Sequence, residues 1–201
     1  MPLNERGRCC NPRCEYPVQD SGSEILPAET DRRTLIVLCG LPGVGKSTVV
    51  KKLQKQIGGK VLRTDEVRKR CFDDPQYTQE ETYMIYGEMF GKAGRLLQRG
   101  HKVILDGTFR SKRLRKEAKR VAERNDVSFR LVKVRCNSRV VKSRIENREG
   151  LSDADFSVHK RLREKFEPIE QGEVVDNSGD ISALLKQVAF ITPNIEHRER
   201  S

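Results

Sequence analysis

Short apolar runs alternate along most of the chain with segments in which apolar residues recur every three or four positions. Short runs of this kind are typical of buried strands, whereas the three-and-four spacing predicts amphipathic helices. Strands are predicted at 35–39, 61–63, 103–106, 129–136 and 174–176, and helices at 47–57, 78 to about 100, 111–124, 138–148, 152–166 and 181–190. Strands that alternate with helices predict an α/β fold with a mostly parallel sheet.

The longest predicted helix starts with a capping-box pattern in Thr78-Gln79-Glu80-Glu81. Its apolar face carries Tyr83, Tyr86 and Phe90 at spacings of three and four. We expect these aromatic residues to pack in the core; base stacking is the alternative.

The first strand opens directly into the sequence Gly40-Leu41-Pro42-Gly43-Val44-Gly45-Lys46-Ser47-Thr48. A strand, then G-x-x-x-x-G-K-S, then a helix is the context of a phosphate-binding P-loop. Its backbone N–H groups and the helix amino terminus would bind phosphate oxygens. Lys46 would reach the β- and γ-phosphates, and the Ser47 hydroxyl would bind Mg²⁺. We therefore predict that Gly40–Thr48 binds ATP, although the sequence does not separate ATP from GTP.

Acidic residues follow two other predicted strands, where ligands bind in parallel sheets. Asp106 comes after Val103-Ile104-Leu105 and would support Mg²⁺, unless it only caps a turn. Asp65 and Arg68 are three positions apart and would share one face of a helical turn. Asp65 would take a proton from an attacking hydroxyl, and Arg68 would hold an anion. A helix cap with a local ion pair is the alternative for this pair.

Two arginines in the helix predicted at 138–148 form a candidate lid. Arg144 and Arg148 are four apart, so they would project together and neutralise charge on the transferred γ-phosphoryl. The helix predicted at 152–166 would be the second arm of this lid. Ordinary surface arginines are the alternative.

The chain carries a formal net charge of +11, and this charge is uneven. Residues 1–31 contain four prolines and no apolar periodicity, and Cys9, Cys10 and Cys14 gather there without the further ligands of a zinc site. We expect a disordered leader over 1–31, with zinc or redox chemistry as alternatives. Lys92–Arg148 holds most of the basic surplus and would attract polyanions, unless these cations only solvate helix faces.

With these motifs in view, the chain resembles the P-loop kinases related to the 5′-kinase domain of polynucleotide kinases, and small bacterial and archaeal AAA-type ATP-binding kinases. The resemblance covers about Thr34–Val188. It rests on Gly40–Thr48, Asp65-x-x-Arg68, Val103–Thr108 and Arg144-x-x-x-Arg148, with further likeness at 152–155 and Val175-Asp176. It implies an adenylate-kinase-like core with a parallel sheet in the order 2-3-1-4-5.

The resemblance also implies roles for individual residues. Asp65 matches the general base, Arg68 the residue that contacts substrate phosphate, and Arg144 or Arg148 the lid arginine. Asp106 matches the acid after the third strand. No phosphatase, ligase or phosphoesterase domain accompanies this core in the chain, which leaves the acceptor less certain than the chemistry.

We therefore expect an ATP- and Mg²⁺-dependent P-loop kinase that phosphorylates a hydroxyl, preferentially an RNA or DNA 5′ end. A metabolite kinase of the same fold, a non-enzymatic nucleotide-gated binding module and a mechanical ATPase are the alternatives. The kinase domain is expected over 32–191, with its lid at about 138–168 and a flexible tail over 192–201. No apolar run approaches the roughly 18 residues of a membrane span and no apolar signal region is evident, so a cytoplasmic protein is expected.

Overall fold

Five parallel strands form one sheet in the part of the chain that the computed structural model describes, residues 33–146 and 156–191. They are β1 (Thr34–Cys39), β2 (Lys60–Arg63), β3 (Val103–Asp106), β4 (Ser128–Arg135) and β5 (Glu173–Asp176). The strand order β2-β3-β1-β4-β5 confirms the order that the family resemblance implied. Because every pairing is parallel, all five carboxyl ends meet at one edge of the sheet.

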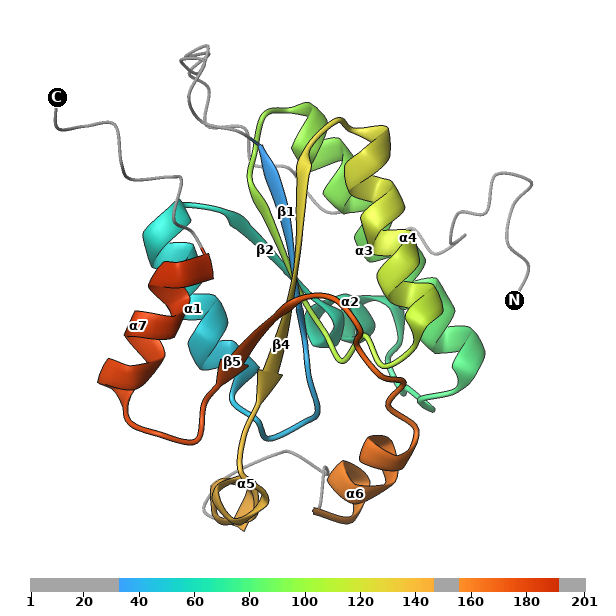
Figure 1. Cartoon of the computed structure of the whole chain (residues 1–201). Helices are drawn as coiled ribbons and strands as arrows, with labels where there is room; N and C mark the ends of the chain where they lie inside the picture. Colours follow the sequence, from blue (N-terminus) through green and yellow to red (C-terminus); the bar gives the residue numbers. More distant parts are fainter. Residues whose placement is uncertain (1–32, 147–155, 192–201) are drawn as a thin grey trace, which may run out of the picture.

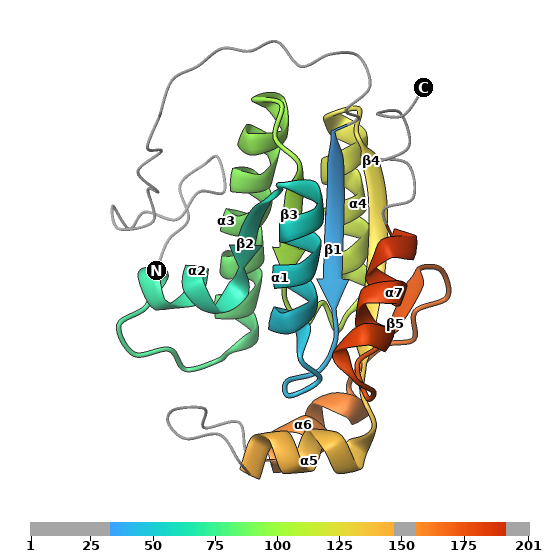
Figure 2. The same cartoon turned by 90° about the vertical axis from the view of Figure 1, so that its left-hand side faces the viewer.

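Helices cover both faces of this sheet and the edge where the strands end (Figure 1). They are α1 (Lys46–Ile57), α2 (Thr64–Cys71), α3 (Gln79–Gln98), α4 (Lys112–Arg124), α5 (Ser138–Glu146), α6 (Phe156–Glu164) and α7 (Ile181–Ile191). Helices α1 and α7 lie on one face, and α3 and α4 lie on the other (Figure 1). Helices α5 and α6 lie beyond the carboxyl ends of the strands (Figure 2). The predicted α/β fold is confirmed.

The central strand β1 connects the two halves of the core because it is buried on both faces. Leu35, Val37 and Cys39 pack in the cluster that includes α3 and α4. Ile36 and Leu38 point the other way, into the cluster with α1 and α7. The alternation of side chains along a strand explains why a continuous apolar run is needed at this position.

Over the described ranges, the predicted elements agree with the observed ones to within a few residues. Helix α6 ends at Glu164, two residues before the predicted end, and its predicted start falls outside the described residues. The leader with Cys9, Cys10 and Cys14, the tail over 192–201, and Arg148 also lie outside the described residues. Over the described ranges, no helix combines the length and apolar character that crossing a membrane requires.

The aromatic residues of α3 confirm the expected core packing. Tyr86 is buried, and its ring meets that of Phe109 edge-on, with 4.8 Å between centroids. Tyr86 also accepts a hydrogen bond from the Phe109 N–H through its hydroxyl, at 2.9 Å. This contact anchors the segment that follows β3, the strand that ends with Asp106.

Candidate active site

The P-loop connects β1 to α1 and turns tightly at Gly43 and Gly45, which have φ angles of +82° and +84°. Side chains with a Cβ rarely adopt this conformation, so the loop needs glycine there. The Lys46 ammonium donates a hydrogen bond to the Leu41 carbonyl at 3.1 Å. Ser47 is exposed in the first turn of α1, at the positive end of the helix dipole. Backbone, cation and hydroxyl groups are thus arranged around one anion-binding loop.

Asn177 holds the P-loop by a side-chain hydrogen bond. It follows β5, is 6% exposed, and donates a hydrogen bond from Nδ2 to the Val44 carbonyl at 3.0 Å. A Cβ atom at Gly45 would lie only 2.1 Å from this Nδ2 atom. The sequence made Val175–Gly179 a candidate for contact with the nucleotide base but did not single out Asn177, whose place directly after a parallel strand is a signal for a site residue.

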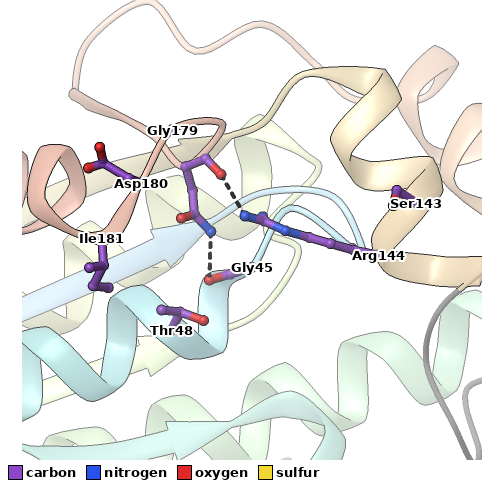
Figure 3. A pocket seen from close by; sticks show the side chains of 9 residues that line it. Gly45, Thr48, Ser143, Arg144, Gly179, Asp180 and Ile181 are labelled. Atoms are coloured by element: carbon purple, nitrogen blue, oxygen red, sulfur yellow. Dashed lines mark hydrogen bonds between the residues drawn. The ribbon is translucent and has the colours of Figure 1, made fainter.

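Arg144 extends from α5 toward the same region (Figure 3). Its Nη2 atom donates to the Asn177 carbonyl at 3.0 Å, and its Nη1 atom donates to the Cys136 sulfur at 3.5 Å. These contacts hold the guanidinium beside the P-loop. The predicted partner of Arg144 in the lid, Arg148, falls in the range that the structure does not describe.

An open pocket of about 550 Å³ lies between the P-loop, α5 and the start of α7 (Figure 3). It is lined by Gly43, Gly45, Thr48, Ser143, Arg144, Asn177, Gly179, Asp180 and Ile181. The lining combines P-loop backbone, one guanidinium, polar groups and an apolar side chain that is 51% exposed, Ile181. This composition suits a ligand that carries both phosphate and a planar apolar part.

Asp106 lies at the carboxyl end of β3 and is 7% exposed. Its Oδ2 atom is 3.5 Å from the Nε atom of Arg63, which occupies the paired position on β2. Burial raises the pKa of Asp106 above its ordinary value of 3.8; nearby Lys46 and Arg63 oppose this shift, and nearby Asp65 adds to it. Lys46, Arg63 and Asp65 are thus the charged groups that act on the Asp106 carboxylate. Arg63 is a neighbour of Asp106 that the sequence analysis missed.

The oxygen groups near the P-loop fit a magnesium ion that is carried by phosphates. Mg²⁺ is usually bound by one or two carboxylates together with substrate phosphates and waters. Ser47 and Asp106 supply a hydroxyl and a carboxylate of the required kind. Within the described ranges, no group of three or more His, Cys, Asp or Glu residues forms a protein-only metal site. The donor set therefore fits a nucleotide-bound magnesium ion.

Asp65 is exposed in the first turn of α2, whereas Arg68, one turn later, is engaged with other side chains. The Arg68 Nη1 atom lies 3.3 Å from Oε2 of Glu81, with both side chains 12% exposed. The Arg68 guanidinium also lies 4.6 Å from the centroid of the Tyr77 ring. The sequence analysis left open a local ion pair with Asp65; the ion pair of Arg68 is with Glu81 instead.

Glu81 also departs from the predicted capping box. Thr78 forms its half of the box, since its hydroxyl accepts a hydrogen bond from the Glu81 N–H at 3.2 Å. The Glu81 carboxylate, however, accepts from the N–H groups of Gln76 at 2.9 Å and Tyr77 at 2.7 Å. The carboxylate therefore accepts hydrogen bonds from the loop before α3 rather than from the Thr78 N–H of the cap. Its ion pair with Arg68 holds it toward α2.

Arg115 is an exception to the prediction that the cations over Lys92–Arg148 attract a polyanion, because it is buried. Arg115 is 6% exposed, and its guanidinium donates to the carbonyls of Phe109 (2.8 Å), Arg110 (3.0 Å), Glu167 (3.1 Å) and Pro168 (2.8 Å). It therefore joins the segment after β3 to the segment after α6. Arg115 is three positions before Ala118 and seven before Ala122, and this spacing places it on the buried face of the helix.

A further residue that the sequence analysis missed holds the P-loop from α6. His159 is 4% exposed and stacks on Phe156, with 5.6 Å between ring centroids. Its Nδ1 atom is hydrogen-bonded to the Pro42 carbonyl at 2.9 Å. A single histidine in a polar helix carries no signal of this contact in the sequence.

Comparison with known proteins identifies the family. The model of a family described as an AAA domain matches residues 35–169. The chain belongs to the AAA domain family. The chain is 32% identical over 160 residues to the uncharacterized protein Rv2004c of Mycobacterium tuberculosis (strain ATCC 25618 / H37Rv), over 72% of this chain and 32% of that protein. The chain thus spans about a third of the length of the curated relatives it matches.

Solved structures show that this AAA domain has a P-loop kinase-like fold. The APS kinase CysC of Mycobacterium tuberculosis, in complex with AMPPNP and APS, is similar with a TM-score of 0.62 and 16% identity, over 82% of this chain and 98% of that chain. A gluconokinase from Sinorhizobium meliloti 1021 is similar with a TM-score of 0.59 and 18% identity, over 82% and 97% of the two chains.

Proposed function

We propose that the protein is an ATP- and Mg²⁺-dependent phosphotransferase that moves the γ-phosphoryl group to a hydroxyl acceptor. The observation that carries this proposal is that one edge of the sheet holds the P-loop after β1, Asp106 at the end of β3 and exposed Asp65 directly after β2. A P-loop that only binds nucleotide needs no exposed carboxylate at that edge. A phosphotransferase does, because the acceptor hydroxyl must lose a proton as it attacks.

Residues Gly40–Thr48 would bind the phosphates, with Lys46 at the β- and γ-phosphates. The open pocket between Arg144, Asn177 and Ile181 would hold the nucleoside. Ser47 and Asp106 would hold magnesium, which neutralises charge on the phosphate oxygens when bound. Arg144, held by the Asn177 carbonyl, would add positive charge on the same side.

Asp65 would orient the acceptor hydroxyl and accept its proton as the oxygen attacks the γ-phosphorus and ADP leaves. Asp65 is suited to this role because it is exposed, whereas Asp106 beside it is buried. Two carboxylates at one edge of the sheet would thus have separate tasks, one at the metal and one at the acceptor.

For the acceptor we favour a polynucleotide 5′-hydroxyl. Helix α4 begins six residues after Asp106, at the same edge of the sheet as the P-loop, and exposes Arg113 and Lys116 in its first half. The Arg113 guanidinium lies 4.7 Å from the centroid of the Tyr83 ring, and a basic surface that includes aromatic rings suits a nucleic acid. A small metabolite is the second candidate, since similar folds occur in a gluconokinase and an APS kinase.

Asp65→Asn tests the proposal, since it removes the base with little change in shape. Transfer of labelled γ-phosphate should fall by at least about 100-fold, as expected for loss of a general base. ATP affinity, measured by calorimetry, should change little because Asp65 makes no predicted contact with the nucleotide. Equal product formation by the wild type and the variant would remove Asp65 as the base. ATP binding by both without product from either would favour a nucleotide-gated binding module.

A further inference from the structure

The loop between α2 and α3 presents one aromatic side chain to solvent in an unfavourable backbone conformation. Tyr77 is 72% exposed, and its φ angle is +56°, in the left-handed region. Bulky residues rarely adopt this conformation, which persists only when surrounding contacts impose it. Such contacts are present around Tyr77 and involve two other elements.

Glu81 and Arg68 hold Tyr77 from the backbone and from one face of the ring. The Tyr77 N–H donates to the Glu81 carboxylate at 2.7 Å, and Glu81 pairs with Arg68 at 3.3 Å. The Arg68 guanidinium lies 4.6 Å from the ring centroid. One ring face therefore rests on a cation that is fixed by a carboxylate, and the high exposure of the side chain leaves the remaining surface open to solvent.

This ring lies near the candidate acceptor site. Arg68, which contacts it, is one helical turn after Asp65 in α2. Figure 2 shows that the connection from α2 to the start of α3 turns back toward the edge of the sheet where the P-loop lies. An acceptor whose hydroxyl is at Asp65 can therefore extend along α2 toward Tyr77.

We propose that Tyr77 is a stacking platform for the nucleobase of the acceptor's terminal nucleotide, an inference that rests on the proposed phosphotransferase function. An aromatic ring backed by a guanidinium is a general device for holding a base, because every base has a π face. Glu81 already neutralises Arg68, so the role of this arginine is to support the ring rather than to bind a second phosphate. The acceptor class is therefore one that carries a base next to its reactive hydroxyl.

Binding can be tested without catalysis because the chain contains no tryptophan. Tyr77→Trp introduces a single indole fluorophore at the platform. A short 5′-hydroxyl oligonucleotide should quench its emission, and the same oligonucleotide with an abasic 5′-terminal nucleotide should not. Equal quenching by both, or by neither, would overturn the assignment of a base to this ring.

Kinetics give a second, independent reading. Tyr77→Ala should raise KM for the intact oligonucleotide by about tenfold, within the range known for base–aromatic stacking, and should leave kcat nearly unchanged. Tyr77→Phe should retain the wild-type KM, since it keeps the ring. Phe190→Ala removes an aromatic side chain that is 80% exposed on α7, across the sheet, and should change nothing. An unchanged KM in Tyr77→Ala would refute the platform.

The two experiments separate failure of this inference from failure of the proposed function. Phosphorylation of the oligonucleotide without base-dependent quenching would leave the function standing and refute the platform. Base-dependent quenching without any phosphorylation would support the platform and refute transfer to a polynucleotide. If neither is seen, the platform and transfer to a polynucleotide are both wrong.

Discussion

Asn177 and Gly45 are fitted to each other at the centre of the candidate site. Asn177 donates to the Val44 carbonyl, and its approach leaves no room for a Cβ atom at Gly45. The backbone carbonyl of Asn177 also accepts from Arg144, so one residue contacts the P-loop and the candidate lid helix. The conformation of the P-loop and the position of Arg144 therefore both depend on Asn177, directly after β5.

Cys39, at the end of β1, makes a pH-dependent contribution to stability. Burial raises the pKa of its thiol from the ordinary value of 9.0 to about 11, against the effect of Arg115, Lys133 and Lys46. Because the folded pKa is the higher one, the contribution is complete below pH 9 and is lost as the pH rises toward 11. We predict that the loss amounts to about 2 to 3 kcal/mol in the free energy of unfolding.

Cys39→Ala isolates this effect from the titration of lysines and tyrosines. Urea unfolding of the wild type and the variant at several pH values between 8 and 11 gives the comparison. The difference in stability between them should shrink as the pH rises, because only the wild type loses the thiol contribution. A difference that stays constant over this range would contradict the account.

At the scale of single residues, the sequence indicated candidate residues but not their contacts. Lys46 was a candidate because of the P-loop pattern, and Asp65 and Asp106 because they lie at the ends of predicted strands. The contacts of Asn177 and His159 were not predicted, because their partners are 133 and 117 positions away in the sequence. Glu81 was assigned to a helix cap, since nothing local indicates that Arg68 would compete for it.

Helix α4 shows how one element can carry both structure and recognition. Its inner face packs Leu114, Ala118 and Ala122, and Arg115 on the same face binds four backbone carbonyls. Its outer face carries exposed cations. Arg115 thus connects the segment after β3, the strand that ends with Asp106, to the segment that follows α6.

We predict that Arg115→Met destabilises the protein by about 3 kcal/mol, because buried carbonyls would lose their donors. Arg113→Met, two positions earlier and exposed, should cost less than about 0.5 kcal/mol. Urea unfolding measures both values. Similar costs for the two substitutions would mean that the carbonyl contacts of Arg115 add little to stability.

The elements themselves were predictable because local patterns determine them. The sequence of β1 is a continuous apolar run, the P-loop is rich in glycine, and α1 is amphipathic. Each pattern is typical of the structure that it forms. Helix α4 was also predicted, but the burial of Arg115 was not, because composition does not distinguish a buried arginine from an exposed one. Its spacing relative to Ala118 and Ala122 was the signal that could have revealed it.

At the scale of the whole molecule, the net charge is +11, and α4 shows how the fold distributes part of this basic charge. In the second half of α4, Lys119 pairs with Glu123, and Arg120 and Arg124 pair with Glu117. The first half exposes Arg113 and Lys116 at the edge of the sheet that holds the candidate active site. This distribution places the polyanion attraction where an acceptor would enter.

Reversal of both charges, Arg113→Glu with Lys116→Glu, should therefore weaken oligonucleotide binding by about tenfold or more at low salt and reduce its salt dependence. ATP affinity should be unchanged, since these residues lie outside the P-loop and its pocket. Fluorescence anisotropy over a range of salt concentrations measures both effects.

Lys55→Glu with Lys186→Glu is the matched control. It makes the same change in net charge at exposed positions of α1 and α7, across the sheet. Weakening equal to that of the α4 variant would show that net charge, rather than the position of Arg113 and Lys116, determines binding.

The most direct test of the central claim is to identify the molecule that receives the γ-phosphate. The purified protein would be incubated with γ-labelled ATP and Mg²⁺, with 5′-hydroxyl RNA, 5′-hydroxyl DNA and a metabolite pool offered together. The account predicts label at the 5′ end of an oligonucleotide. Label only in a small molecule would contradict the proposed acceptor, and no transfer to any of them, despite ATP binding, would contradict the proposed phosphotransferase activity.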